Sequence, residues 1–164
     1  MRAPRKWVCS SAWLERTPDK GEVGSSSLPR PTTITLKKLF KIFMKEYFGS
    51  CHCAAVKFRF ISDEAVEIWK CNCSICDSYD YQHLFIKHED FELISGRKEL
   101  SSYKFGTKSA EHLFCKICGI KSYYQPRSHP EMYSVNLRCV NNPPHIGKVI
   151  EFDGVNFDES IKEI

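Results

Sequence analysis

CHC at residues 51–53, CNCSIC at 71–76 and CKICG at 115–119 are the stretches that decide the fold of this 164-residue chain, and they contain seven of its nine cysteines. A C-x-x-C turn lets two thiolates face one ion, and the glycine that ends the last stretch relieves the tight backbone there. A lone buried cysteine is usually a small apolar side chain. Seven cysteines in three tight groups instead predict metal binding.

The composition indicates one globular domain with a modest core. The chain is 42% hydrophobic, with 11 Phe, 7 Tyr and 3 Trp, and its length is near that of one average domain. No apolar run approaches the roughly 18 residues of a membrane span, and the N-terminus lacks an apolar segment followed by a small-residue cleavage site. We therefore expect a cytoplasmic protein that has no membrane partner and whose cysteines bind metal rather than form disulfides.

The net charge of +4 is distributed unevenly along the chain. Residues 1–46 carry 10 Lys and Arg against 4 Asp and Glu, whereas residues 47–164 carry 14 against 16. The basic surplus therefore lies wholly in the N-terminal part. Because the remainder lacks the basic stripe that phosphate binding requires, we expect no nucleic-acid partner.

Residues 1–46 also differ in character from the rest of the chain. Residues 21–31 (GEVGSSSLPRP) are rich in Gly, Ser and Pro, which predicts disorder over residues 1–33. The segment Thr35–Tyr47 spaces apolar residues among lysines at helical intervals. It fits a membrane-surface helix or a short helical or disordered extension, and its length of barely three turns favours the extension.

A second interpretation of residues 1–46 concerns where translation begins. Residues 22–33 can be reverse-translated into a string that resembles the T-arm of a transfer RNA gene, which suggests that Met44 is the true start. On either interpretation, we expect the folded domain to span residues 47–164.

From residue 47 onward, apolar residues recur with period two. This alternation is present at residues 56–60, 66–68, 91–93 and 132–138. Short alternating segments separated by turn-forming pairs predict antiparallel strands and a mainly β fold. Ser95-Gly96-Arg97 predicts a hairpin turn between two of these strands.

The spacing of the cysteines divides them into two candidate zinc sites. Two cysteines from the first stretch and two from the third complete a tetrahedral structural site that clamps the sheet. The middle stretch has three thiolates and no fourth ligand of its own, which is the arrangement of a catalytic zinc with one open position. The alternative is a second structural site completed by a distant residue such as His112, His129 or Cys139.

The segment from Gly49 to about Asn156 resembles the glutathione-dependent formaldehyde-activating enzyme family and, within it, the centromere protein V branch. The resemblance rests on GSCHCAAVKF (Gly49–Phe58), CNCSIC (Cys71–Cys76), HLFCKICGIKSYYQPRSHP (His112–Pro130) and YSVNLRCV (Tyr133–Val140). It covers about two-thirds of the chain. Three cysteine motifs in this order are much more specific than any one of them.

This resemblance implies an all-β fold of the Mss4-like type, with antiparallel sheets stapled by zinc. It implies two zinc ions per chain: a structural zinc on Cys51, Cys53, Cys115 and Cys118, and a catalytic zinc on Cys71, Cys73 and Cys76. Founding members are described as carbon–sulfur lyases that combine glutathione with formaldehyde to give S-(hydroxymethyl)glutathione. A basic residue often follows the middle motif in the family, whereas this chain has Asp77.

The function that we predict is a zinc-dependent carbon–sulfur lyase acting on a small thiol adduct, with glutathione as the example thiol. Arg127 could hold a substrate carboxylate, because a guanidinium binds a carboxylate through two hydrogen bonds. The alternative function is a non-catalytic, zinc-stapled binding module. The number of protein ligands at the middle cysteines distinguishes the two, because a fourth ligand would close the site.

Overall fold

The computed structural model describes residues 44–164. The predictions of disorder over residues 1–33, of a helical segment over Thr35–Tyr47 and of a start at Met44 concern sequence that lies mostly outside the described residues or at their edge. The first strand, β1, begins at Lys45, so the end of the predicted helical segment is extended backbone. Among the described residues, no helix is long and apolar enough to span a membrane.

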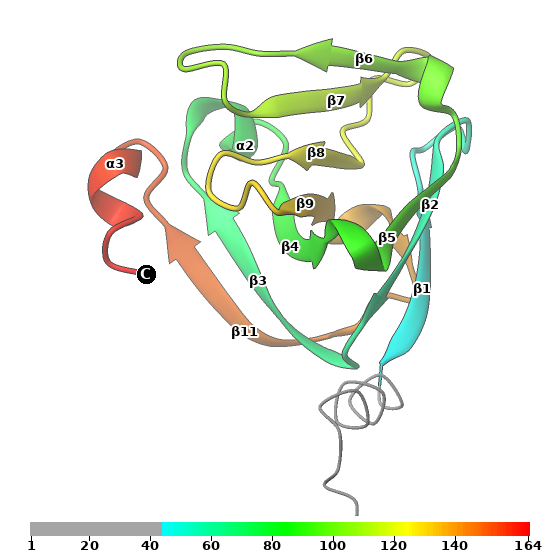
Figure 1. Cartoon of the computed structure of the whole chain (residues 1–164), viewed down its shortest axis with the longest axis horizontal. Coiled ribbons are helices and arrows are strands. Elements are labelled where there is room, and N and C mark those ends of the chain that lie inside the picture. The colour runs from blue at the N-terminus through cyan, green and yellow to red at the C-terminus, as the bar shows by residue number, and fades with distance from the viewer. Residues whose placement is uncertain (1–43) are drawn as a thin grey trace, which may run out of the picture. The chain divides into compact units, whose positions relative to one another are not determined.

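Within residues 44–164, the strands form two sheets (Figure 1). One sheet has the order β10-β1-β2-β5, and its strands span Val140–Asn141, Lys45–Ser50, Lys57–Ser62 and Phe91–Ser95. The other has the order β11-β3-β4-β9-β8-β7-β6, and its strands span His145–Phe152, Ala65–Cys71, Gln82–Lys87, Met132–Asn136, Tyr123–Gln125, Glu111–Cys115 and Leu100–Tyr103. The described helices are short: α2 at Ser74–Asp77, α3 at Phe157–Ser160, and 3-10 turns at His88–Asp90, Arg97–Glu99 and Leu137–Cys139. The prediction of a mainly β fold is confirmed.

The period-two pattern places apolar side chains between the sheets. In β2, Phe58 and Phe60 are buried while Lys57 and Arg59 are exposed, because successive side chains of a strand point to opposite faces. The buried phenylalanines stack on each other with their ring centroids 6.4 Å apart, and they join the main hydrophobic core with residues of β3, β4 and β9. The inward-facing residues of both sheets therefore meet in one core.

Two local predictions need correction. The strands are not all antiparallel, because β11 pairs in parallel with β3 from His145↔Ala65 to Phe152↔Cys71. The residues Ser95–Arg97 do not form a hairpin turn, since β5 pairs with β2 whereas β6 pairs with β7 in the other sheet. Gly96 instead turns the chain from one sheet to the other with a φ of 88°, a left-handed conformation that glycine adopts without a steric cost.

The parallel pair positions the ends of two strands next to each other. Figure 1 shows β3 and β11 running side by side, with α2 following β3 and α3 following β11. Cys71 is the last residue of β3 and lies opposite Phe152, the last residue of β11. The loop after β11 and the cysteines after β3 are therefore brought together at one edge of the larger sheet.

Candidate functional site

The first metal site that the structure supports joins two distant segments. Cys51 follows β1 and Cys53 lies in the turn after it, while Cys115 ends β7 and Cys118 lies in the next turn. Their four sulfurs lie within 4.8 Å of one another, with 3.6 Å between Cys51 and Cys53 and 3.7 Å between Cys53 and Cys115. Zinc–sulfur bonds of about 2.3 Å in a tetrahedron place sulfurs about 3.8 Å apart. The donor set therefore fits a zinc ion.

Backbone hydrogen bonds shape the turns of this site. The Gly119 N–H donates to the Cys115 carbonyl at 2.8 Å, and the Cys115 N–H donates to the Ile120 carbonyl at 3.0 Å. Gly119 has a φ of 73°, so the glycine after the C-x-x-C supplies the left-handed residue that this turn requires. The Val56 N–H also donates to the Cys51 sulfur at 3.3 Å. The sequence motif thus predicts the local geometry correctly.

The second cluster lies where β3 runs into α2. The sulfurs of Cys71, Cys73 and Cys76 lie within 4.8 Å of one another, and no other Cys, His, Asp or Glu of residues 44–164 joins this group. The N–H groups of Cys76 and Asp77 both donate to the Cys73 carbonyl at 3.0 Å, which folds the motif into a single helical turn. Hydrogen bonds with Cys71 and then Cys76 lower the pKa of Cys73, so the trio favours a thiolate.

None of the three candidates for a fourth ligand joins the group of three sulfurs. His129 stacks on Phe85 with ring centroids 4.0 Å apart, and His112 stacks on Tyr124 at 4.8 Å. Cys139 packs against the main core rather than with the trio. The second cluster therefore offers three protein ligands among the described residues, which matches a zinc site that keeps one position for another molecule.

Gly154 makes close contact with this cluster, although the sequence did not single it out. A Cβ atom at this position would lie 2.3 Å from the Cys71 sulfur and 3.0 Å from Cys73 Cβ. Real Cβ atoms essentially never approach other atoms to less than 3.0 Å. A side chain at residue 154 would therefore occupy the space of the metal ligands.

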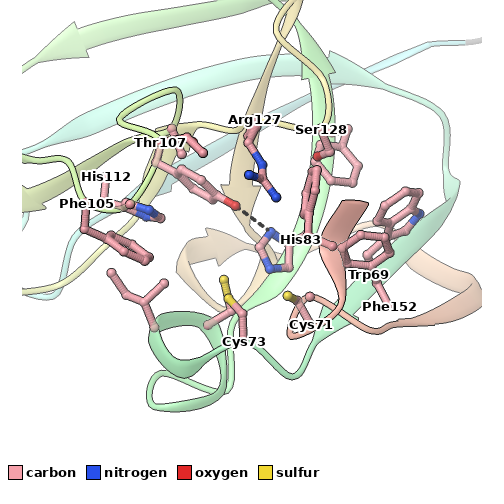
Figure 2. A pocket seen from close by; sticks show the side chains of 18 residues that line it. Trp69, Cys71, Cys73, His83, Phe105, Thr107, His112, Arg127, Ser128 and Phe152 are labelled. Atoms are coloured by element: carbon pink, nitrogen blue, oxygen red, sulfur yellow. Dashed lines mark hydrogen bonds between the residues drawn. The ribbon is translucent and has the colours of Figure 1, made fainter. Parts of the chain in front are cut away.

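A cavity of about 250 Å³ opens beside the three cysteines (Figure 2). In Figure 2, Phe105 and His112 lie on one side of it and Trp69 and Phe152 on the other, while Arg127 points toward the cysteines from the opposite side. Its lining also includes apolar, aromatic and small polar residues: Ile75, Phe85, Thr107, Ala110, Tyr124, Ser128 and Phe157. The second cluster therefore borders a space that a small molecule could enter.

Two buried histidines border the cavity in their neutral form. His83 Nδ1 lies 2.9 Å from the Ser134 hydroxyl and 3.4 Å from the Tyr124 hydroxyl, which Figure 2 shows as a dashed line. Its Nε2 and the Nδ1 of His112 have no hydrogen-bond partner within residues 44–164. Burial, followed by the charge of Lys121, lowers the pKa of His83 to about 3 and that of His112 to about 4.

Lys121 is a buried cation next to the second cluster. Its side chain is fully buried, and its Nζ has no hydrogen-bond partner among the described residues. The Nζ instead lies 3.8 Å from the ring centroid of Tyr124 and 4.6 Å from that of Tyr81. Burial lowers the pKa of Lys121 to about 8, while the charges of Cys76, Cys73 and Cys71 act in the opposite direction. The thiolates therefore stabilise this ammonium group, and it offsets their negative charge.

Arg127 lines the cavity, as its predicted role requires. Its guanidinium lies 3.4 Å from the ring centroid of Phe157 and 3.5 Å from an Asp158 carboxylate oxygen. Asp158 is largely exposed, so this ion pair is weak. The structure thus brings Arg127 to the same cavity as Cys71, Cys73 and Cys76, although these residues come from separate segments.

Sequence reasoning missed Lys121, His83 and Gly154. Metal-binding motifs are recognised by short spacings, whereas strands or loops separate these residues from the middle cysteines. A lysine followed by buried Ser122, Tyr123 and Tyr124 is the only local signal, and it is ambiguous by itself. Their roles depend on side-chain contacts across the larger sheet.

Comparisons with known proteins agree with these observations. A family model described as glutathione-dependent formaldehyde-activating enzyme matches residues 46–152. A crystal structure of a Rhodobacter sphaeroides protein, a structural-genomics target, is 33% identical, with a TM-score of 0.56. The match covers 63% of this chain and 98% of that protein.

Proposed function

The chain belongs to the glutathione-dependent formaldehyde-activating enzyme family, and we propose that it is a zinc-dependent carbon–sulfur lyase acting on small thiol adducts. The observation that carries this proposal is the three-cysteine cluster beside a cavity, with no fourth protein ligand among residues 44–164. The representative reaction is the formation of S-(hydroxymethyl)glutathione. A carbon–sulfur bond forms between the thiol and formaldehyde, and the thiol proton ends on the aldehyde oxygen.

Cys71, Cys73 and Cys76 would hold the catalytic zinc, and Cys51, Cys53, Cys115 and Cys118 the structural one. Zinc bound to Cys71, Cys73 and Cys76 would lower the pKa of a substrate thiol and keep it as a nucleophilic thiolate. Three cysteine thiolates bring a large negative charge into a partly buried site. The Lys121 ammonium would offset part of that charge from inside the protein, because it interacts electrostatically with all three cysteines and its Nζ has no hydrogen-bond partner among the described residues.

The other residues of the cavity would orient the substrate. Arg127 points into the cavity and would bind a carboxylate of the thiol in competition with the exposed Asp158. His83 and His112 stay neutral near pH 7, so they would accept or donate hydrogen bonds at the carbonyl oxygen without adding charge. Apolar rings around them exclude water from the reacting atoms. Both clusters need reduced cysteines, which the cytoplasm provides.

The test compares catalysed with spontaneous adduct formation. The full chain, loaded with zinc, is mixed with glutathione and ¹³C-formaldehyde, and exchange between free and adduct carbon is followed by NMR. We expect exchange above the spontaneous rate, and we expect Cys73→Ser to abolish the excess. Cys139→Ser is the matched control, because Cys139 belongs to neither cluster. Exchange no faster than the spontaneous rate with glutathione and with other thiols would favour the alternative, a zinc-stapled binding module.

A further inference from the structure

One side of the cavity is a continuous aromatic wall, which we define as Phe85, Trp69, Phe152 and Phe157. Trp69 contacts Phe85 edge-on with ring centroids 5.1 Å apart, and it stacks on Phe152 at 5.2 Å. Phe152 contacts Phe157 edge-on at 5.5 Å. These rings come from β4, β3, β11 and α3, so the wall is built by four elements. Phe105 lies on the opposite side of the same cavity (Figure 2).

Charged groups are sparse around this cavity. Among the described residues, Arg127 is the one Lys or Arg side chain in its lining, and no Asp or Glu lines it. The guanidinium of Arg127 packs on the ring of Phe157 at one end of the wall. Within this lining, a charged peptide such as glutathione therefore finds one partner for a carboxylate and none for its ammonium group, since the Asp158 carboxylate that pairs with Arg127 lies outside the lining. Most of the cavity surface suits an uncharged, apolar group.

The size of the cavity also favours a large apolar group on the substrate. A water molecule occupies about 30 Å³ in the liquid, so a cavity of about 250 Å³ is far larger than a hydroxymethyl group, which has one carbon and one oxygen. A hydroxymethyl group by itself would cover little of the aromatic wall. A ring attached to the adduct carbon would cover the wall and remove that apolar surface from water.

We infer that the cavity takes the hemithioacetal of an apolar, preferentially aromatic aldehyde, with its ring against the aromatic wall and its sulfur toward Cys71, Cys73 and Cys76. This inference rests on the proposed lyase function and names its substrate class. In the cleavage direction, the carbon–sulfur bond breaks and the hydroxyl oxygen becomes the aldehyde oxygen. The hydroxyl proton ends on the sulfur of the released thiol. No oxidant or reductant takes part, because the carbon enters and leaves at the same oxidation level.

A pair of unreactive thioethers tests the inference by binding alone. S-benzylglutathione and S-methylglutathione share the peptide and differ only in the group on sulfur, which stands for an aromatic or a one-carbon aldehyde. Titration calorimetry on the full zinc-loaded chain should give at least tenfold tighter binding of the benzyl compound. That ratio equals about 1.4 kcal/mol, which is at the lower end of the gain from burying a phenylalanine side chain. Equal affinities, or tighter binding of the methyl compound, would overturn the inference.

Substitutions in the aromatic wall test where in the cavity the benzyl group binds. Phe157→Ala should reduce the benzyl-to-methyl affinity ratio at least threefold. Any effect of Phe157 on Arg127 acts on both peptides and cancels in the ratio. Phe48→Ala is the matched control, because Phe48 is 46% exposed on β1 and outside the cavity lining. An unchanged ratio in Phe157→Ala and also in Phe105→Ala would overturn the placement of the ring.

Turnover separates this inference from the proposed function. We expect the chain to exchange the glutathione adduct of benzaldehyde faster, relative to its spontaneous rate, than the adduct of formaldehyde. Catalysed exchange of the formaldehyde adduct, together with equal binding of the two thioethers, would overturn the inference and leave the lyase function in place. Exchange of neither adduct would overturn the inference as stated, and the survey of other thiols would then decide the lyase function.

Discussion

Replacing Gly154 by alanine is expected to disrupt the second metal site and leave the rest of the fold intact. The added Cβ would lie 2.3 Å from the Cys71 sulfur, which is about 1 Å short of ordinary van der Waals contact. The Cys71 sulfur or the loop after β11 must therefore move by a comparable distance. Metal–ligand distances tolerate changes of only about 0.2 Å, so a displaced sulfur can no longer complete the set with Cys73 and Cys76.

The size of the effect follows from the cost of overpacking. Forcing an extra methyl group into a packed site costs about 1–3 kcal/mol. If that cost falls on the metal-bound state, the affinity of the second site for zinc decreases about 5- to 150-fold. The first site should keep its affinity, because its cysteines lie at and after the ends of β1 and β7 rather than of β3.

The assay is competition with a chromophoric zinc chelator, with elemental analysis and circular dichroism melts on the same samples. The Gly154→Ala variant should titrate as one tight and one weakened site, and it should unfold cooperatively. Gly147→Ala is the matched control, because its Cβ would meet its nearest atom, the Val66 carbonyl oxygen, at an ordinary 3.7 Å. Two sites of unchanged affinity in Gly154→Ala would refute the close packing of this loop against Cys71.

Four further predictions concern the metals and the buried charges. Elemental analysis of protein purified without chelators should give two zinc ions per chain, and a single ion would contradict the second site. Cys115→Ser should lose cooperative unfolding, since it opens a site whose binding free energy is part of the folding free energy. Cys73→Ser should instead stay folded, with one zinc ion and no activity. Equal destabilisation of the two variants in circular dichroism melts would make both sites structural. Lys121→Met should lower the zinc affinity of the second site about tenfold, and it should not reduce the free energy of unfolding, because it removes a buried charge. Lys121→Arg should restore part of the zinc affinity. Unchanged zinc affinity in Lys121→Met would refute the electrostatic role of this lysine. Burial lowers the pKa of His83 to about 3 in the folded state, below its ordinary value of 6.5. The unfolded state therefore binds more protons between these two values, and the free energy of unfolding falls as pH drops through that window. Denaturant melts at about pH 7 and about pH 5 should show a smaller loss of stability for His83→Gln than for the wild type, and equal losses would contradict a neutral buried imidazole.

The sequence alone was sufficient to predict the class of fold and two sets of cysteines that lie together in the structure. The sets Cys51, Cys53, Cys115, Cys118 and Cys71, Cys73, Cys76 are the sets that the structure brings together. This is possible because a thiolate pair needs a short, fixed spacing, and a half-buried strand shows a period of two, so both signals are local. The mainly β fold class follows from the strand pattern, whereas the Mss4-like type is what the family resemblance implies.

The tertiary structure decided what depends on contacts between distant segments. The parallel pairing of β3 with β11 is not visible in any local pattern, yet it brings Gly154 against Cys71. The sequence Ser95-Gly96-Arg97 is typical of a hairpin turn, but β5 pairs with β2 and β6 pairs with β7, which lie in different sheets. Lys121 and the aromatic wall acquire their roles from packing across several strands. Local spacing determines which side chains can bind a metal, whereas the register and order of the strands determine the electrostatic and apolar surroundings of that metal.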